Sequence, residues 1–297
     1  MSMPTIEFHA ATFALQWFAG GMAFCWFTTR RRVVGPGYGM MIRGVYLVIG
    51  ALGVAAGFRY GQVVMRDIAA AIAAVVTLGV LILSIVWRRG GVSGAQEEHD
   101  RRTARVAAMT GIERTGTTTP AQGREYPPLF DLVPAVIAGV GLIAAAFAAV
   151  EGPVSGAAGS HVVSLVRVLV GALFLGAVTN AMLLGHWYLV QPGLPRRLVN
   201  EIVAALLYIW PVEATVMLLP TGMMSVLTGT VDDGWGGTLG WFWVACVLTT
   251  GVLAFVTRAA LRERQYSAVM AATGLLYLAL PTAFGTDVVA RAVLEGV

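Results

Sequence analysis

Long apolar stretches separated by short polar segments dominate the pattern of the chain. Eight of these stretches are long enough to cross roughly 30 Å of hydrocarbon, which takes about 20 helical residues. They cover residues 7–28, 40–58, 67–87, 130–150, 162–190, 199–220, 236–257 and 266–285. The pattern predicts an all-α fold, namely a polytopic membrane helix bundle of about eight transmembrane helices, in which residues 1–297 form a single transmembrane domain.

One long polar stretch, about residues 88–128, follows the third apolar stretch. Its second half is rich in Gly, Thr and Pro, which is typical of a flexible connector. We expect a cytoplasmic loop here, either a docking or regulatory segment or an ordinary solvated loop. Because three spans precede it and five follow, the chain shows no obvious division into the two equal repeats of many transporters.

Composition supports the membrane class and excludes several others. The chain is 57% hydrophobic and only 12% charged, with a mean hydropathy of +0.75, whereas soluble domains carry roughly 25% charged residues. Disorder and nucleic-acid binding are excluded as well, because the basic residues stand in short clusters between apolar runs. Cys25 and Cys246 lie in separate apolar runs, so neither a disulfide nor a metal site is indicated.

The basic residues predict the orientation of the bundle. All twenty are arginines, and short cytoplasmic loops accumulate positive charge. If the loop after the first span is cytoplasmic, nearly all loop arginines are cytoplasmic and only Arg59, Arg66 and Arg291 lie outside. An even number of spans then places both termini on the outer, non-cytoplasmic side. We therefore expect a multi-pass protein of a bacterial-type cytoplasmic (inner) membrane, in contact with the lipid bilayer.

A first group of polar residues is expected at the cytoplasmic side. Arg43 lies near the start of the second span, His186 and Trp187 near the end of the fifth, and Glu201 at the start of the sixth. A tight turn joins the fifth and sixth spans, so His186 and Glu201 should lie at similar depth. Together these residues could hydrogen-bond a quinone and pass on its proton. The alternative is an aromatic belt with merely interfacial His186 and Glu201.

A second group is expected toward the outer side. Arg167 lies about a turn and a half into the fifth span, and Glu213 follows the Trp210–Pro211 pair in the sixth. Antiparallel pairing of these spans predicts a buried Arg167–Glu213 ion pair. It could lock two helices together, or Glu213 could act as a proton relay beside the proline.

The four histidines raise the question of haem. His9 and His161 both lie near outer span ends and could supply two axial ligands at one depth. Both are also close enough to water to need no ligand, so the sequence does not favour haem. Metal-binding, nucleophile and phosphate-loop motifs are absent, and we predict neither a metal site nor a catalytic residue.

These observations favour one function and leave two alternatives open. The aromatic, histidine-containing end of the fifth span, the tight loops and the missing repeat favour a membrane subunit of an electron-transfer complex. Such a subunit would bind quinone or act as a scaffold beside soluble or membrane partner subunits. The first alternative is a secondary transporter or channel whose path passes Glu213, Arg167 and Asn180. The second is a structural or assembly protein.

Overall fold

The computed structural model describes residues 9–61, 63–93, 104, 108–109, 124–150, 161–219, 222–263 and 265–295. Among them there are helices and turns but no strand. The long helices are α1 (Ala10–Thr29), α2 (Pro36–Tyr60), α3 (Val64–Val86), α5 (Leu132–Val150), α6 (His161–Val190), α7 (Arg197–Leu218), α9 (Thr238–Ala260) and α10 (Tyr266–Glu295). Three short helices accompany them: η1 (Trp87–Gly90), η2 (Pro128–Asp131) and α8 (Met223–Leu227).

The predicted all-helical architecture is confirmed for this part of the chain. It contains 8 helices that are long and apolar enough to cross a membrane, at the positions expected from the sequence. Two boundaries differ most from those expected. α2 begins earlier, at Pro36, because proline at the first helical position has no N–H to satisfy. α10 continues to Glu295, well past the predicted end at residue 285, and so carries Asp287 and Arg291 on helix rather than in a loop.

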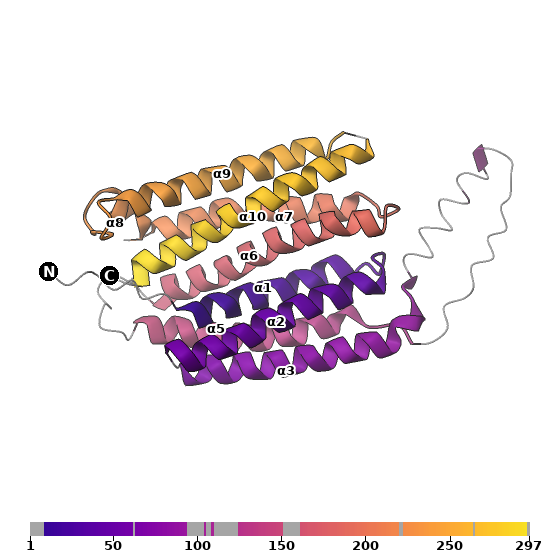
Figure 1. Cartoon of the computed structure of the whole chain (residues 1–297), viewed down its shortest axis with the longest axis horizontal. Helices are drawn as coiled ribbons and strands as arrows, with labels where there is room; N and C mark the ends of the chain where they lie inside the picture. The colour runs from indigo at the N-terminus through magenta and orange to yellow at the C-terminus, as the bar shows by residue number, and fades with distance from the viewer. Residues whose placement is uncertain are drawn as a thin grey trace.

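The helices form a flattened bundle with α1 and α6 at its centre (Figure 1). α1 packs against α2, α5 and α6, whereas α6 packs against α1, α5, α7 and α10. α3 covers α2 and α5 on one side, and α9 covers α10 and α7 on the other. α1 begins and α10 ends at the same end of the bundle (Figure 1). We call the other end, where the loops after α1, α3, α6 and α9 carry most of the described arginines, the arginine-rich end.

Two glycines set the closest approach in the bundle. A Cβ atom on Gly20 of α1 would collide with the carbonyl group of Ala172 in α6, and one on Gly176 would collide with the main chain of Gly20. Small residues at a crossing let helix backbones pack directly in a membrane, where van der Waals contact replaces the hydrophobic effect. The α1–α6 crossing is therefore the tightest and least adjustable part of the core.

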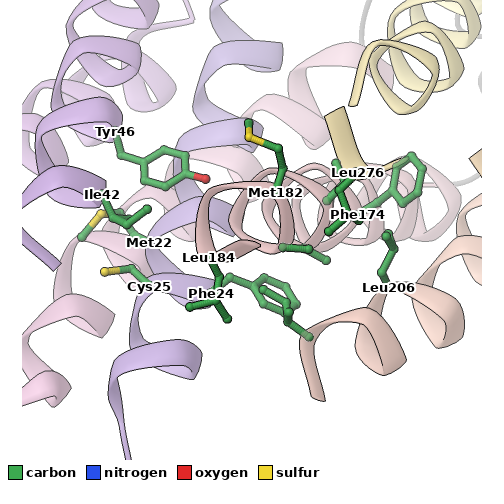
Figure 2. Close-up of a cluster of buried hydrophobic side chains, with 14 of the residues drawn as sticks. Met22, Phe24, Cys25, Ile42, Tyr46, Phe174, Met182, Leu184, Leu206 and Leu276 are labelled. Carbon is green, nitrogen blue, oxygen red and sulfur yellow. The ribbon is translucent and has the colours of Figure 1, made fainter. Parts of the chain in front are cut away.

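The hydrophobic core continues from this crossing around α6. Figure 2 shows Phe174, Met182 and Leu184 of α6 together with side chains from α1, α2, α7 and α10. Phe174, Leu184, Leu206 and Leu276 are completely buried. The core thus joins the first helices of the chain to the last ones through α6, so α6 is its common element.

The outer faces of the bundle are apolar as well. α3 exposes Ile68, Ile72, Val75 and Ile82, and α9 exposes a similar row that includes Trp241, Leu248, Val252 and Phe255. Exposed apolar surface of this extent is uncommon on soluble monomers but is what lipid contact requires. The structure is therefore that of a multi-pass membrane protein whose α3 and α9 faces contact the bilayer.

Candidate functional site

Five polar side chains lie close together in the half of the bundle away from the arginine-rich end. We call them the carboxyl cluster: Gln16 of α1, Arg167 of α6, Glu213 of α7, and Asp287 and Arg291 of α10. Gln16, Glu213 and Asp287 are completely buried. Ionisable groups at membrane depth are costly, and those that persist commonly mark substrate, ion or proton pathways.

Asp287 and Arg291 are neighbours on one face of α10. The Arg291 Nε donates to Asp287 Oδ2 at 2.9 Å, across one turn of helix. The side chains reach the centre of the bundle because α6 presents Gly171 opposite them. A Cβ atom on Gly171 would lie 2.7 Å from Asp287 Oδ1 and would collide with the Gln16 amide nitrogen. Glycine at position 171 therefore makes the space in which Asp287 and Gln16 meet.

Glu213 completes the cluster from α7. The carboxyl group of Asp287 and the guanidinium groups of Arg291 and Arg167 are its charged neighbours. Arg167 does not hydrogen-bond to it, since the guanidinium donates to the main-chain carbonyls of Val216 at 3.2 Å and Leu219 at 2.5 Å. The structure thus brings Arg167 and Glu213 to one site, but without the direct hydrogen-bonded ion pair that we expected.

Several polar atoms of the cluster have no hydrogen-bond partner within the chain. They are both side-chain polar atoms of Gln16, both carboxyl oxygens of Glu213 and Oδ1 of Asp287. Buried polar groups in folded proteins are nearly always satisfied, and an exception points to a functional role or to a bound proton, ion or water. Three adjacent, fully buried side chains with unsatisfied atoms are therefore the strongest sign of a functional site in the described structure.

A proline lies within each helix that contributes a carboxyl group. Pro211 of α7 precedes Glu213 by two residues, and Pro281 of α10 precedes Asp287 by six. Each proline lacks the N–H that would bond to the carbonyl one turn earlier. Both carboxyl groups therefore lie just beyond a break in the hydrogen-bond ladder of their own helix.

A second buried charge site lies toward the arginine-rich end, and its groups are fully partnered. Arg43 of α2 donates to both oxygens of Asp131, at 2.7 and 2.8 Å. The Tyr126 hydroxyl donates to Asp131 Oδ1 at 3.0 Å, and the Tyr126 ring stacks under the Arg43 guanidinium at 4.1 Å. Burial and the nearby Asp131 carboxylate raise the pKa of Tyr126, so its hydroxyl stays protonated and continues to donate.

The residues expected to form a quinone site do not lie together. Arg43 pairs with Asp131. Glu201 accepts from Arg31 at 2.6 Å at the surface, rather than from His186. The exposed His186 is 3.2 Å from the Tyr277 hydroxyl, and the Trp187 indole donates to Gln191 instead.

The two histidines considered for haem lie at separate helix starts. His9 directly precedes α1 and is exposed. His161 begins α6, and its ring packs against Phe147 with 5.1 Å between centroids. Within the described ranges, no three His, Cys, Asp or Glu side chains converge in a way that could hold a metal ion.

The sequence interpretation missed four members of the two sites. Asp287 and Arg291 were assigned to the outer loop, and Gln16 was not considered. Asp131 was missed as the partner of Arg43, although Phe130 was taken as the start of a span. The sequence did contain a signal for Asp287 and Arg291. An acid and an arginine four residues apart lie on one face if the helix continues.

No family model matches the chain, and no curated protein or solved structure is significantly similar to it. The class of this protein is therefore defined by its own fold and by the buried cluster. It is a multi-pass helical membrane protein with a buried carboxyl–arginine cluster near one end of the bundle.

Proposed function

We propose that this protein is a secondary transporter or channel in which the carboxyl cluster binds and releases a proton. The observation that carries the proposal is the close approach of Glu213 and Asp287, both completely buried, with unsatisfied carboxyl oxygens. Such a position is where transporters hold coupling protons or ions, between helices and at membrane depth.

The chemistry follows from the charges of the cluster. With both acids ionised, two carboxylates are balanced by Arg167 and Arg291. Asp287 is already bonded to Arg291, so Glu213 is the acid that takes up the proton. Protonation forms one O–H bond and raises the charge of the cluster by one. The new hydroxyl can donate to Asp287, so a repulsion between two carboxylates becomes a hydrogen bond.

This geometry favours transport over the electron-transfer alternative. A quinone site required Arg43, His186 and Glu201 at one place, and each has a different partner instead. No described contact gathers other groups suited to a quinone. Quinone binding and partner subunits therefore rest on the sequence pattern alone, whereas the transport proposal rests on a three-dimensional cluster.

Infrared difference spectroscopy tests proton binding directly. Purified full-length protein is titrated with acid while the C=O stretch of protonated carboxyl groups is followed. We expect a titrating band that disappears in Glu213→Gln and shifts in Asp287→Asn. Glu201→Gln is the matched control, because Glu201 is an acid paired to arginine at the surface. An unchanged band in Glu213→Gln would contradict the proposal.

A glycine pair tests whether the site geometry matters. Gly171→Ala introduces a methyl group against Gln16 and Asp287, whereas Gly139→Ala has nothing within 4 Å. We expect the pH at which the carboxyl band titrates to change in Gly171→Ala and to stay the same in Gly139→Ala. Equal titrations would show that Asp287 and Gln16 do not control the proton site.

Transport itself is tested in proteoliposomes that contain a pH-sensitive dye. An imposed membrane potential should drive proton entry faster with wild-type protein than with Glu213→Gln at equal protein content. Equal rates for the two proteins would overturn the transport step.

We also propose that the arginine-rich end faces the cytoplasm of a bacterial-type inner membrane, which places both termini outside. Single cysteines introduced at Ser93 and Thr230, in a background with both native cysteines replaced, lie at opposite ends of the bundle. A membrane-impermeant thiol reagent added to whole cells should label position 230 and not position 93. The reverse labelling pattern would invert the topology.

A further inference from the structure

A cavity opens at the arginine-rich end, separate from the carboxyl cluster. It lies between the start of α2, the end of α3 with η1, and the segment that precedes α5. Its lining includes Arg32, Arg43, Arg88, Trp87 and Tyr126. Pockets that combine apolar walls with a few converging polar groups are the usual form of ligand sites.

The charge of this cavity is positive. Arg43 is neutralised by Asp131, and Arg32 pairs with Glu125 at 3.0 Å near the surface. Arg88 is exposed and has no acidic partner within the described part of the chain. Three arginines therefore face two carboxylates, and the surplus positive charge is that of the exposed Arg88.

Arg124 adds a further positive charge beside the cavity. Its guanidinium group stacks on the Trp87 ring at 4.7 Å. Guanidinium groups bind phosphoryl oxygens through paired N–H donors, which makes this surface suited to a phosphate-bearing anion.

The walls of the cavity point to an amphiphilic occupant. Trp87, Val34, Val92 and Pro128 line it beside the arginines. The neighbouring last turns of α3 expose Val86 on the outer face of the bundle. The cationic mouth is thus next to a lipid-facing helix end, where a headgroup and its acyl chains would lie.

We propose that this cavity binds the phosphoryl headgroup of an anionic phospholipid. Arg32 and Arg88 contact the phosphate oxygens, and the acyl chains follow the exposed face of α3. Basic pockets between transmembrane helices recognise anionic lipid headgroups in this way. The site is independent of the proposed proton transport, since none of its lining residues belongs to the carboxyl cluster.

The test measures lipid binding to the delipidated full-length protein in detergent by native mass spectrometry. Phosphatidylglycerol and phosphatidylcholine with identical acyl chains are the two probes. We expect phosphatidylglycerol to bind about tenfold more tightly, and Arg88→Gln to lose about tenfold of that affinity, the value of one charge-assisted hydrogen bond.

Arg89→Gln is the matched control. Arg89 is the next residue, is also exposed and carries the same charge, but it does not line the cavity. We expect its affinity to stay within about twofold of wild type, as for a screened surface charge. Equal losses in both variants, or equal affinity for the two lipids, would overturn the site.

A competition arm separates a lipid from a soluble source of phosphate. Inorganic phosphate and glycerol phosphate should displace phosphatidylglycerol only weakly, because they lack the acyl chains that contact α3. If inorganic phosphate displaces the lipid at concentrations comparable with the concentration of the lipid, the ligand of the site is a soluble anion. That result would overturn the phospholipid assignment.

Discussion

Two buried charge sites of this bundle, the Arg43–Asp131 site and the carboxyl cluster, contrast in how completely their polar atoms are partnered. At the Arg43–Asp131 site, both carboxylate oxygens accept from Arg43, and one also accepts from Tyr126. In the carboxyl cluster, Glu213 accepts no hydrogen bond within the chain, and Asp287 uses one oxygen only. Burial alone therefore does not distinguish a structural charge from a functional one. The number of unsatisfied atoms is the difference between the two sites on which the proposed proton site rests.

The largest expected effect is a loss of stability at the Arg43–Asp131 site, which the carboxyl cluster should not show. Asp131→Ala leaves the Arg43 guanidinium buried without its counter-ion, which should lower the free energy of unfolding by about 3–5 kcal/mol. Thermal unfolding in detergent measures the loss. The double variant Arg43→Met with Asp131→Leu removes both charges and should recover most of it. A loss below about 1 kcal/mol in the single variant, as for an exposed pair, would contradict a structural role.

A smaller effect is expected when one hydrogen bond is removed from the same site. Tyr126→Phe deletes the hydroxyl that donates to Asp131 but leaves the ring under Arg43. The free energy of unfolding should fall by about 1 kcal/mol, because Arg43 continues to satisfy both carboxylate oxygens. A loss as large as that of Asp131→Ala would mean that Tyr126, rather than Arg43, is the principal partner of the carboxylate.

The corresponding change in the carboxyl cluster should barely alter stability. Glu213→Gln removes a charge that accepts no hydrogen bond and faces another acid, so the free energy of unfolding should change by less than about 1 kcal/mol. The same unfolding assay measures it, while the infrared titration reports the loss of proton binding. A large destabilisation would place Glu213 among the structural charges.

The smallest effect is expected at a carboxylate outside the membrane. Asp233 accepts from the main-chain N–H groups of Trp235, Gly237 and Leu239 before α9. Burial opposes ionisation here, but these N–H groups outweigh it and hold the pKa of Asp233 below its ordinary value. Its stabilising contribution is therefore present at neutral pH and is lost as the pH falls through the lowered pKa.

Asp233→Asn should accordingly unfold at a slightly lower temperature than wild type at neutral pH. The difference should shrink on acidification below the lowered pKa, where the wild-type carboxyl group is also neutral. A difference that is independent of pH would show that the side-chain shape, rather than the ionisation of Asp233, stabilises this turn.

Most of the helical architecture could be predicted from the sequence, because one physical requirement controls it. A segment in lipid must satisfy its backbone internally and be apolar over the bilayer thickness, and the eight spans satisfy this locally. The ends were less predictable. The pattern around Asp287 and Arg291 looked like a loop because both are charged, whereas packing against Gly171 allows α10 to continue with both side chains turned inward.

The members of the candidate sites were harder to predict, because they depend on which helices pack against one another. The sequence does not show this. Arg43 was expected at membrane depth and is buried, but its partner Asp131 lies 88 residues away on another helix. Arg167 and Glu213 were placed at a common depth, and both do belong to the carboxyl cluster. Asp287, a neighbour of Glu213, comes from the last helix, and Gln16, which meets Asp287 at Gly171, comes from the first. Only the three-dimensional packing brings these helices together.

The prolines of α7 and α10 have a mechanical consequence. The carbonyl groups of Leu207 and Tyr277 have no partner one turn ahead, so each helix is softest to bending at Pro211 and Pro281. Bending there would tilt the terminal turns that bear Glu213 and Asp287, whereas at the α1–α6 crossing glycine packs directly against backbone. Bending at the two prolines would therefore change the distance between the two acids without disturbing that crossing.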